Sequence, residues 1–213
     1  MNVTLSQTSK IPSKSISISA FLCKTGSKLA KIEGTVCHEC YARRGFYHMP
    51  SVKEAMEKRL EFMQSIDFVP RMVAMLGMED RFRWFDSGDV QSEQMANDIL
   101  DIIEATPWCQ HWLPTKEYII WRNVLKNRNV PENVALRFST PKDNSRPITT
   151  PDGVLTSTTY NDKRTAGARA GFQCPAHLHK EQTGKYNCGP CRACWDTNVS
   201  NIAYPKRFDK VKK

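Results

Sequence analysis

Hydrophobic and polar residues alternate with a period of two along residues 15–21, a pattern typical of a β-strand. Three further short apolar runs, bounded by turn residues, predict strands over residues 81–85, 110–113 and 134–138. We expect another strand over residues 153–160, which are rich in β-branched side chains. Pro114 is expected to end the strand that precedes it.

Apolar residues at helical spacing fill the intervals between these strands. Three helix faces repeat in this way: Val52, Met56, Leu60 and Met63, then Met95, Ile99 and Ile102, and finally Tyr118, Trp121 and Leu125. Ser51 and Glu54 have the spacing of a capping box at the start of the first helix, and Ser92 is placed to cap the second. Residues 24–36 hold two glycines and many polar side chains, which predicts a loop.

The alternation of strands and helices indicates an α/β fold with parallel strands and right-handed crossovers. Such sheets bind ligands beyond the carboxyl ends of their strands. Polar residues that follow the predicted strands should therefore form one binding site: Ser87, Gly88, Asp89, Thr115, Lys116, Ser139 and Thr140. The composition changes beyond residue 143, and we expect one domain over residues 1–145 and an extension over residues 146–213.

Seven of the eight cysteines fall into two groups with a common spacing. The first group reads C-x13-C-x2-C, and the second repeats this spacing and adds one C-x2-C step. The groups are Cys23, Cys37 and Cys40, and Cys174, Cys188, Cys191 and Cys194. Thiolates at such spacing bind zinc and iron–sulfur clusters. A disulfide framework fits less well, because disulfide-rich chains are usually short and secreted.

Three thiolates in the first group suit a [4Fe-4S] cluster in which one iron has no protein ligand and can bind a small molecule. Zinc held by the three cysteines and by His38 or His48 is the competing interpretation. Since His38 lies inside the C-x2-C step, we expect its side chain to point away from the sulfurs. The eighth cysteine, Cys109, is expected to pack as a small hydrophobic residue.

The second group supplies four thiolates, a complete set for zinc or for another [4Fe-4S] cluster. Two alternatives stay open: His177 or His179 replaces a cysteine, or both groups share one cluster. Residues 165–205 are rich in Cys, Gly and Lys, and we expect this metal-bound C-terminal segment to depend on metal for folding.

The formal net charge of +9 favours polyanions, and nucleic acid is the obvious candidate. Basic residues gather at residues 43–44, 58–59 and 163–164 and in a tail over residues 206–213. No apolar run approaches the roughly 20 residues that cross a bilayer. The polar start lacks the features of a secretory signal, so we expect a cytoplasmic protein without a membrane partner.

Four segments resemble a group of uncharacterised bacteriophage proteins that look like small radical S-adenosylmethionine enzymes: residues 37–42, 82–89, 112–116 and 188–195. In the first of them, the C-x2-C step followed by an aromatic residue looks like half of the radical S-adenosylmethionine signature. The resemblance implies a partial (β/α) barrel whose cluster lies in the loop after the first strand. It also implies that residues 87–89 meet the methionine part of the cofactor and that Ser139 and Thr140 meet its ribose.

Two functions follow from these observations. The first is an iron–sulfur enzyme that cleaves S-adenosylmethionine reductively, with an electron donor as partner, in the cytoplasm of an infected host cell if a phage encodes the chain. The alternative is a non-catalytic iron–sulfur or zinc protein that binds nucleic acid or a phage or host partner. The sequence contains no motif of the serine hydrolases, phosphate-binding loops or metalloproteases.

Overall fold

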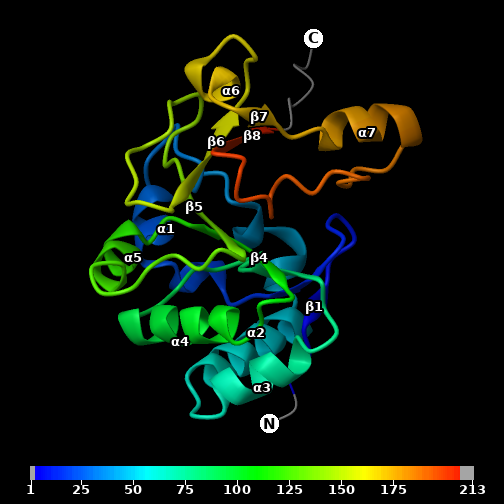
Figure 1. Ribbon diagram of the computed structural model, residues 1–213. Coiled ribbons are helices and arrows are strands. Elements are labelled where there is room, and N and C mark those ends of the chain that lie inside the picture. The colour runs from blue at the N-terminus through cyan, green and yellow to red at the C-terminus, as the bar shows by residue number, and fades with distance from the viewer. Residues whose placement is uncertain (1–2, 207–213) are drawn as a thin grey trace.

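One eight-stranded sheet organises the protein, whose residues 3–206 are described by a computed structural model (Figure 1). The strand order is β1-β2-β3-β4-β5-β6-β8-β7, and every neighbouring pair is parallel except β1 and β2. The strands are β1 Ser6–Gln7, β2 Lys14–Ile16, β3 Arg81–Trp84, β4 Gln110–Thr115, β5 Val134–Ser139, β6 Leu155–Tyr160, β7 Phe172–Gln173 and β8 Asn201–Pro205. The expected α/β fold with parallel strands is therefore confirmed.

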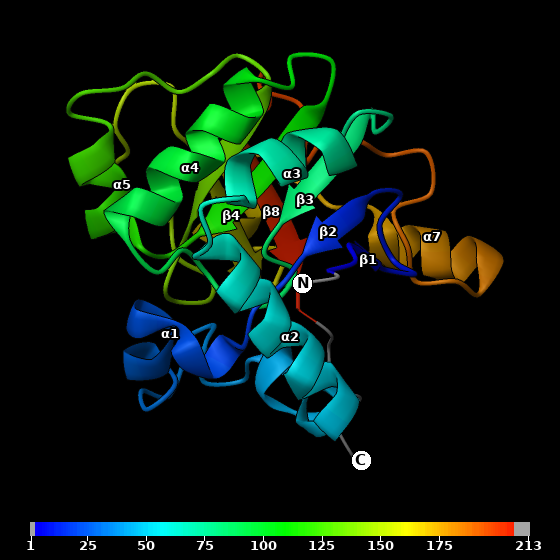
Figure 2. The ribbon, with the colours of Figure 1, turned by 90° about the horizontal axis from the view of Figure 1, so that it is seen from below.

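Helices α2 to α5 cover one face of this sheet, and α7 lies on the other side with the cysteine-rich chain beside it (Figures 1 and 2). The α-helices are α1 Lys24–Leu29, α2 Pro50–Met63, α3 Phe68–Met75, α4 Glu93–Glu104, α5 Tyr118–Val124, α6 Ala166–Arg169 and α7 Ala176–Thr183. Three short 3-10 helices are η1 Ala20–Leu22, η2 Tyr41–Arg43 and η3 Gly45–His48. Within residues 3–206, no helix has the length and apolar character needed to cross a membrane.

Alternate residues of each strand enter two different cores. Trp84, Leu113 and Leu136 pack against the helices in the larger core, as period-two strands require. Trp112 and Ile202 enter the smaller core on the opposite face. Met56, Met63 and Cys109 are buried, which confirms that these side chains fill the core.

The predicted strand over residues 15–21 is too long. Strand β2 ends at Ile16, and residues 20–22 form η1, whose first turn is capped by the Ser19 hydroxyl. The alternation of polar and apolar residues in the sequence reflects the two faces of the sheet, because Ser15 and Ile16 are both buried but on opposite faces. Beyond Ile16 the Ile18 N–H donates to the Ser87 carbonyl, which lies in a turn and not in a strand.

The expected end of a strand at Pro114 is also wrong, because β4 continues to Thr115. Strand β3 pairs with β4 only as far as Trp112, so one edge of β4 is free of ladder partners at Pro114. A proline is tolerated where its missing N–H has no ladder partner to bond.

Helix starts were predicted with mixed success. The Ser92 hydroxyl accepts from the Met95 N–H at 3.1 Å, which confirms the cap of α4. The capping box at residues 51–54 is wrong, because α2 begins at Pro50, with Met49 as N-cap and no side-chain cap. Proline fits the first helical turn because its φ is already helical and no N–H is lost there.

Several helices and strands escaped the sequence pattern. Residues 24–36 contain α1 where only a loop was expected, and α3 fills the chain between α2 and β3. Residues 165–205 include α6, β7, α7 and β8, and β8 joins the main sheet between β6 and β7. Both predicted segments, 1–145 and 146–213, thus contribute strands to one sheet. The basic tail beyond Lys206 lies outside the described residues.

Buried His111 should make stability fall in acid. Its Nδ1 accepts from Trp84 Nε1 at 3.2 Å, and Thr106 Oγ1 lies 2.9 Å from its Nε2. Burial lowers the pKa of His111 to about 3. In the unfolded chain the same imidazole has a pKa near 6.5, so between these two pH values the unfolded chain binds a proton that the folded chain does not. Stability is therefore complete above pH 6.5 and is lost as pH falls toward 3.

From pH 7.5 to pH 5, we expect His111 alone to lower the free energy of unfolding by about 2 kcal/mol. Urea unfolding at both pH values gives the change in the free energy of unfolding with pH for the wild type and for His111→Gln. The difference between these two changes is the contribution of His111. The exposed His38→Gln variant is the matched control for a change of histidine to glutamine at the surface. Equal pH slopes for the wild type and His111→Gln would refute the assignment.

Candidate functional site

The chain after β2 carries the first cysteine group past the end of the sheet. Cys23 precedes α1 and Cys40 precedes η2. The Val36 N–H donates to the Pro141 carbonyl at 2.9 Å, and Thr35 forms a β-bridge with Lys142. Because Pro141 and Lys142 follow β5, these contacts hold the cysteine loop at the carboxyl end of that strand.

A glycine leaves room between two of the sulfurs. A Cβ placed on Gly26 would lie 2.9 Å from Cys23 Cβ, 3.6 Å from Cys23 Sγ and 3.7 Å from Cys37 Sγ. The first of these distances is shorter than van der Waals contact, so a side chain there would push Cys23 aside. Cys40 is near enough to both thiols to act on their ionisation. The structure thus places the Cys23 and Cys37 sulfurs close to Gly26.

The same surroundings oppose free thiolates. Burial raises the pKa of the Cys23 thiol well above its ordinary value, and Asp89 and the other two cysteines add to the shift. Burial also raises the pKa of Cys37, although the Lys116 ammonium opposes this shift. A buried anion is costly unless a cation compensates it. Thiolates at this place would therefore be stabilised by a bound metal centre.

The chain turns sharply where β3 ends. Phe85 has a φ of 50° and Gly88 a φ of 85°, both in the left-handed region. A Cβ on Gly88 would lie 2.4 Å from Ile18 Cγ1 and 2.8 Å from the Ile18 carbonyl oxygen, so no other residue fits. Gly88 therefore fixes the turn of residues 86–89 against the chain that follows β2.

Asp89 joins the ends of two strands. Its Oδ1 accepts from the Val90 N–H at 2.8 Å and from Thr115 Oγ1 at 2.7 Å, and its Oδ2 accepts from the Lys116 N–H at 2.8 Å. Burial raises the pKa of Asp89 to about 6, and the three hydrogen bonds partly offset this effect. The carboxylate thus holds the turn after β3 to the end of β4, and Thr115 and Lys116 lie beside it.

Glu117 is a site residue that the sequence reasoning missed. Its two carboxylate oxygens accept from the Thr25 N–H and the Thr25 hydroxyl, both at 2.7 Å. The Glu117 side chain is buried and connects the end of β4 to Thr25 of α1, which lies two residues after Cys23. An acidic residue directly after Thr115 and Lys116 was the available signal, but nothing in the sequence pairs it with Thr25.

Two hydroxyls at the strand ends have no internal partner. Ser87 Oγ and Thr140 Oγ1 are buried, and neither forms a hydrogen bond within the part of the chain that the structure describes. Ser139 differs, because its hydroxyl accepts from Ser157 Oγ at 2.9 Å and its carbonyl accepts from the Tyr118 hydroxyl. Unpartnered buried hydroxyls are rare and are expected to bind water or a ligand.

All eight cysteines are free thiols. Within residues 3–206, no three His, Cys, Asp or Glu side chains converge closely enough to hold a single metal ion. The two histidines near the first group contact the backbone: His38 Nδ1 lies 3.1 Å from the Ala30 carbonyl oxygen, and His48 Nε2 lies 2.8 Å from that of Arg43. The cysteine thiols of the described residues thus do not meet at one point.

The second cysteine group lies on the sheet face opposite α2 to α5. Cys174, Cys188 and Cys194 pack in the smaller core, next to Trp112 and Trp195. Burial raises the pKa of Cys188 to about 11 and that of Cys194 to about 12. Cys174, Cys188 and Cys194 thus share one small core. The two groups therefore occupy different places, one at the strand ends and one over the sheet.

Arg137 of β5 fastens this second segment to the sheet. The side chain is completely buried and donates five hydrogen bonds, all to backbone carbonyls. The acceptors belong to Thr156, Ala193, Cys194, Asp196 and Val199. Burial lowers the pKa of Arg137, and the nearby Tyr204, Cys194 and Asp196 oppose this shift. Negative charge on the nearby cysteines would offset this desolvation cost.

Further donors lie on the same face. The Arg83 guanidinium lies 4.4 Å from the centre of the Trp112 ring. Arg83 Nε and Trp112 Nε1 are buried without a hydrogen-bond partner in the described residues. The Tyr204 hydroxyl lies 3.1 Å from Cys194 Sγ. These groups make the second cysteine site electropositive and rich in donors.

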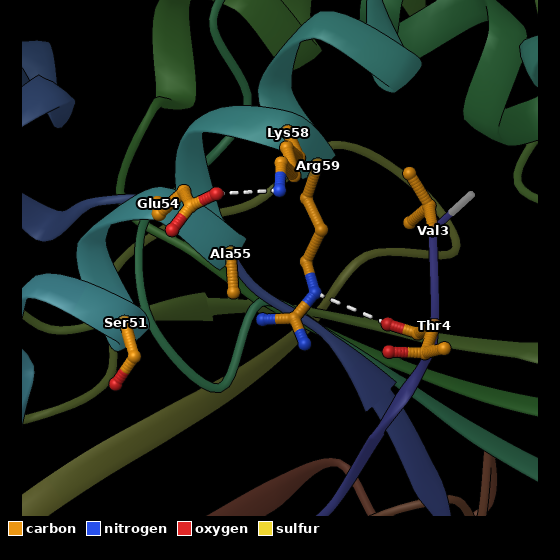
Figure 3. A pocket seen from close by; sticks show the side chains of 7 residues that line it. All are labelled: Val3, Thr4, Ser51, Glu54, Ala55, Lys58 and Arg59. Carbon is orange, nitrogen blue, oxygen red and sulfur yellow. Dashed lines mark hydrogen bonds and ion pairs between the residues drawn. The ribbon is translucent and has the colours of Figure 1, made fainter. Parts of the chain in front are cut away.

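Two surface hollows lie away from both cysteine groups. One, of about 180 Å³, lies beside α2, where Arg59 Nε donates to the Thr4 carbonyl at 3.3 Å and Lys58 pairs with Glu54 at 2.6 Å (Figure 3). Its lining residues are Val3, Thr4, Ser51, Glu54, Ala55, Lys58 and Arg59. The other, of about 430 Å³, is lined by Leu125, Arg128, Asn129, Val130, Pro151 and Asp152. Neither is lined by a cysteine.

A protein-family model described as Gene product 88 matches residues 2–197. The chain belongs to the Gene product 88 family. The family is of the bacteriophage type, which confirms the resemblance to phage proteins. The match spans both cysteine groups and every strand-end residue of the predicted site. No curated protein and no solved structure matches this Gene product 88 chain.

Proposed function

We propose that the protein is an iron–sulfur protein of the radical S-adenosylmethionine type, in which Cys23, Cys37 and Cys40 hold a [4Fe-4S] cluster with one open iron. The observation that carries the proposal is the position of the Cys23 and Cys37 sulfurs close to Gly26, in a loop that also contains Cys40 and is held at the carboxyl end of β5. When bound, such a cluster supplies the electron for reductive cleavage of S-adenosylmethionine.

The chemistry of the donor set fits a cluster. Each thiolate of a cubane binds a different iron, so the sulfurs need to surround a volume and not to meet at one ion. Thirteen residues separate Cys23 from Cys37, where the usual signature has three. The extra chain forms α1 and is held by Glu117 and by the chain after β5, which supports a cluster loop of unusual length.

The surrounding residues suit a polar ligand beside the open iron. Ser87 and Thr140 offer unpartnered hydroxyls, and Lys116 adds a positive charge near Cys37. Asp89 already accepts three hydrogen bonds, so its part is to position the turn after β3 and not to be the main acceptor for a ligand amine. The Ser139 hydroxyl already accepts a hydrogen bond from Ser157, so the proposed contribution of Ser139 is its position next to Thr140.

The proposal includes two features of the architecture. Strands β2 to β6 have the same order in the sheet as along the chain, which supports a partial (β/α) barrel. A second inorganic centre, iron–sulfur or zinc, would be held by Cys174, Cys188, Cys191 and Cys194, where Arg137 and the donors of Arg83 and Trp112 would offset its negative charge. Action in the cytoplasm of an infected host cell belongs to the same proposal.

Anaerobic assay of the reconstituted full chain tests the chemistry. With dithionite as reductant and S-adenosylmethionine added, we expect 5′-deoxyadenosine to accumulate, measured by liquid chromatography and mass spectrometry. The Cys109→Ala variant, which changes a buried cysteine outside both groups, serves as the control and should form the product. A protein with a complete cluster that yields no 5′-deoxyadenosine above the rate of reductant alone would reject the enzymatic proposal.

A further inference from the structure

The chain around the first cysteine group exposes unusually many large hydrophobic side chains. Six of the twelve exposed ones in the described part of the chain lie between residues 21 and 49: Phe21, Leu22, Ile32, Tyr41, Phe46 and Met49. Phe46 is 81% exposed and Tyr41 is 60% exposed. Solvent-exposed aromatic side chains gathered in this way mark an interaction surface. We refer to residues 20–49 as the rim.

Several side chains of the rim contact one another. The rings of Phe21 and His48 meet edge to face with centroids 5.6 Å apart, and those of Tyr41 and Tyr47 are 5.9 Å apart. The Arg43 guanidinium lies 4.5 Å from the centre of the Phe21 ring. Aromatic and cationic groups are therefore interleaved on the rim.

The rim is also basic. It contains five Lys or Arg residues and two Glu residues, a net charge of +3. One of the two acids, Glu39, is already paired with Lys206 at 2.9 Å. Residues 207–213, which follow Lys206, add four basic residues and one Asp to the sequence. The rim itself thus combines a positive net charge with exposed aromatic rings.

We propose that the rim binds single-stranded nucleic acid. Basic surfaces follow the phosphate backbone, and exposed rings such as Phe46 offer faces on which unpaired bases stack. An acidic protein would satisfy the charge but would not require flat exposed rings, and a duplex hides its base faces. The inference goes beyond the proposed cleavage of S-adenosylmethionine and does not depend on it.

Fluorescence anisotropy with a labelled single strand of about 20 nucleotides tests the rim, using the anaerobic, metal-loaded full chain. We expect binding that weakens steeply as salt is raised. Phe46→Ala should raise the dissociation constant about 5- to 100-fold, as expected for the loss of one stacked base. Ile66→Ala is the matched control, because Ile66 is 97% exposed between α2 and α3 and should leave binding unchanged.

Two outcomes would overturn the inference. One is an equal dissociation constant for the wild type and Phe46→Ala. The other is competition by polyglutamate as strong as that by unlabelled single strand, which would point to an acidic protein partner. The 5′-deoxyadenosine assay fails or succeeds independently: binding without product keeps the rim inference and rejects the enzyme, and product without binding does the reverse.

Discussion

Replacing Cys37 by Ala is expected to remove the first inorganic centre and leave the second. A cubane held by three thiolates cannot keep its place with two, so iron and sulfide should each fall by about four per chain. 5′-Deoxyadenosine formation should fall to the level of reductant alone. Iron, sulfide and zinc assays on anaerobically purified protein measure the first effect, and the product assay measures the second.

Two further variants make this result specific. Cys191→Ala should lose only the metal of the second group, and the buried Cys109→Ala should lose none. Because the two groups lie at different places, their losses should be independent. Unchanged iron in Cys37→Ala would contradict the assignment of the first group as ligands. Loss of all metal in every one of the three variants would indicate general misfolding instead.

Replacing Arg137 by Met should have the second large effect. The change removes five hydrogen bonds from a fully buried side chain. The Ala193 and Asp196 carbonyls keep a backbone donor, whereas those of Cys194 and Val199 lose the donor that Arg137 provides. Each hydrogen bond from a buried charged donor is worth about 1 kcal/mol or more, so we expect the free energy of unfolding to fall by about 4 kcal/mol. The metal of the second group should be lost more readily to a chelator.

Arg128 provides the matched control. It binds Asp101 and Glu104 on the surface, at 2.7 Å and 2.8 Å, and Arg128→Met should cost about 1 kcal/mol or less. Arg137→Lys should fall between the wild type and Arg137→Met, since lysine keeps the charge but not the planar fork. Urea unfolding and chelator titration provide the two measurements. An Arg137→Met protein with wild-type stability and metal retention would show that the anchoring role is wrong.

Local pattern was sufficient for the parts of the fold that local chemistry determines. Apolar runs located β3, β4, β5 and β6, and helical spacing located α2, α4 and α5. The cysteine spacing pointed to two groups, and the structure places Cys23 and Cys37 at the strand ends and Cys174, Cys188 and Cys194 in the core on the other sheet face. Strand β8 was missed because residues 201–205 form a short run whose burial depends on β6 and β7, far away in the sequence.

The supporting residues of the site could not be paired from sequence. Glu117 bonds Thr25 across 92 positions, and Arg137 bonds the segment of Cys194 across 57. A charged residue in the middle of the apolar run 134–138 was a usable sign of a buried role for Arg137. The need for glycine at residue 26 arises only from the folded loop, where the Cys23 and Cys37 sulfurs lie on either side of it. Such long-range contacts have no periodic signature.

The most direct test of the central claim is the metal and sulfide content of the wild-type chain, isolated anaerobically and never reconstituted. We predict iron with an equal amount of acid-labile sulfide, at about four of each per chain or about eight if both groups hold clusters. Protein that contains neither iron nor zinc, or whose grouped cysteines are joined as disulfides, would contradict the claim that these thiols hold inorganic centres.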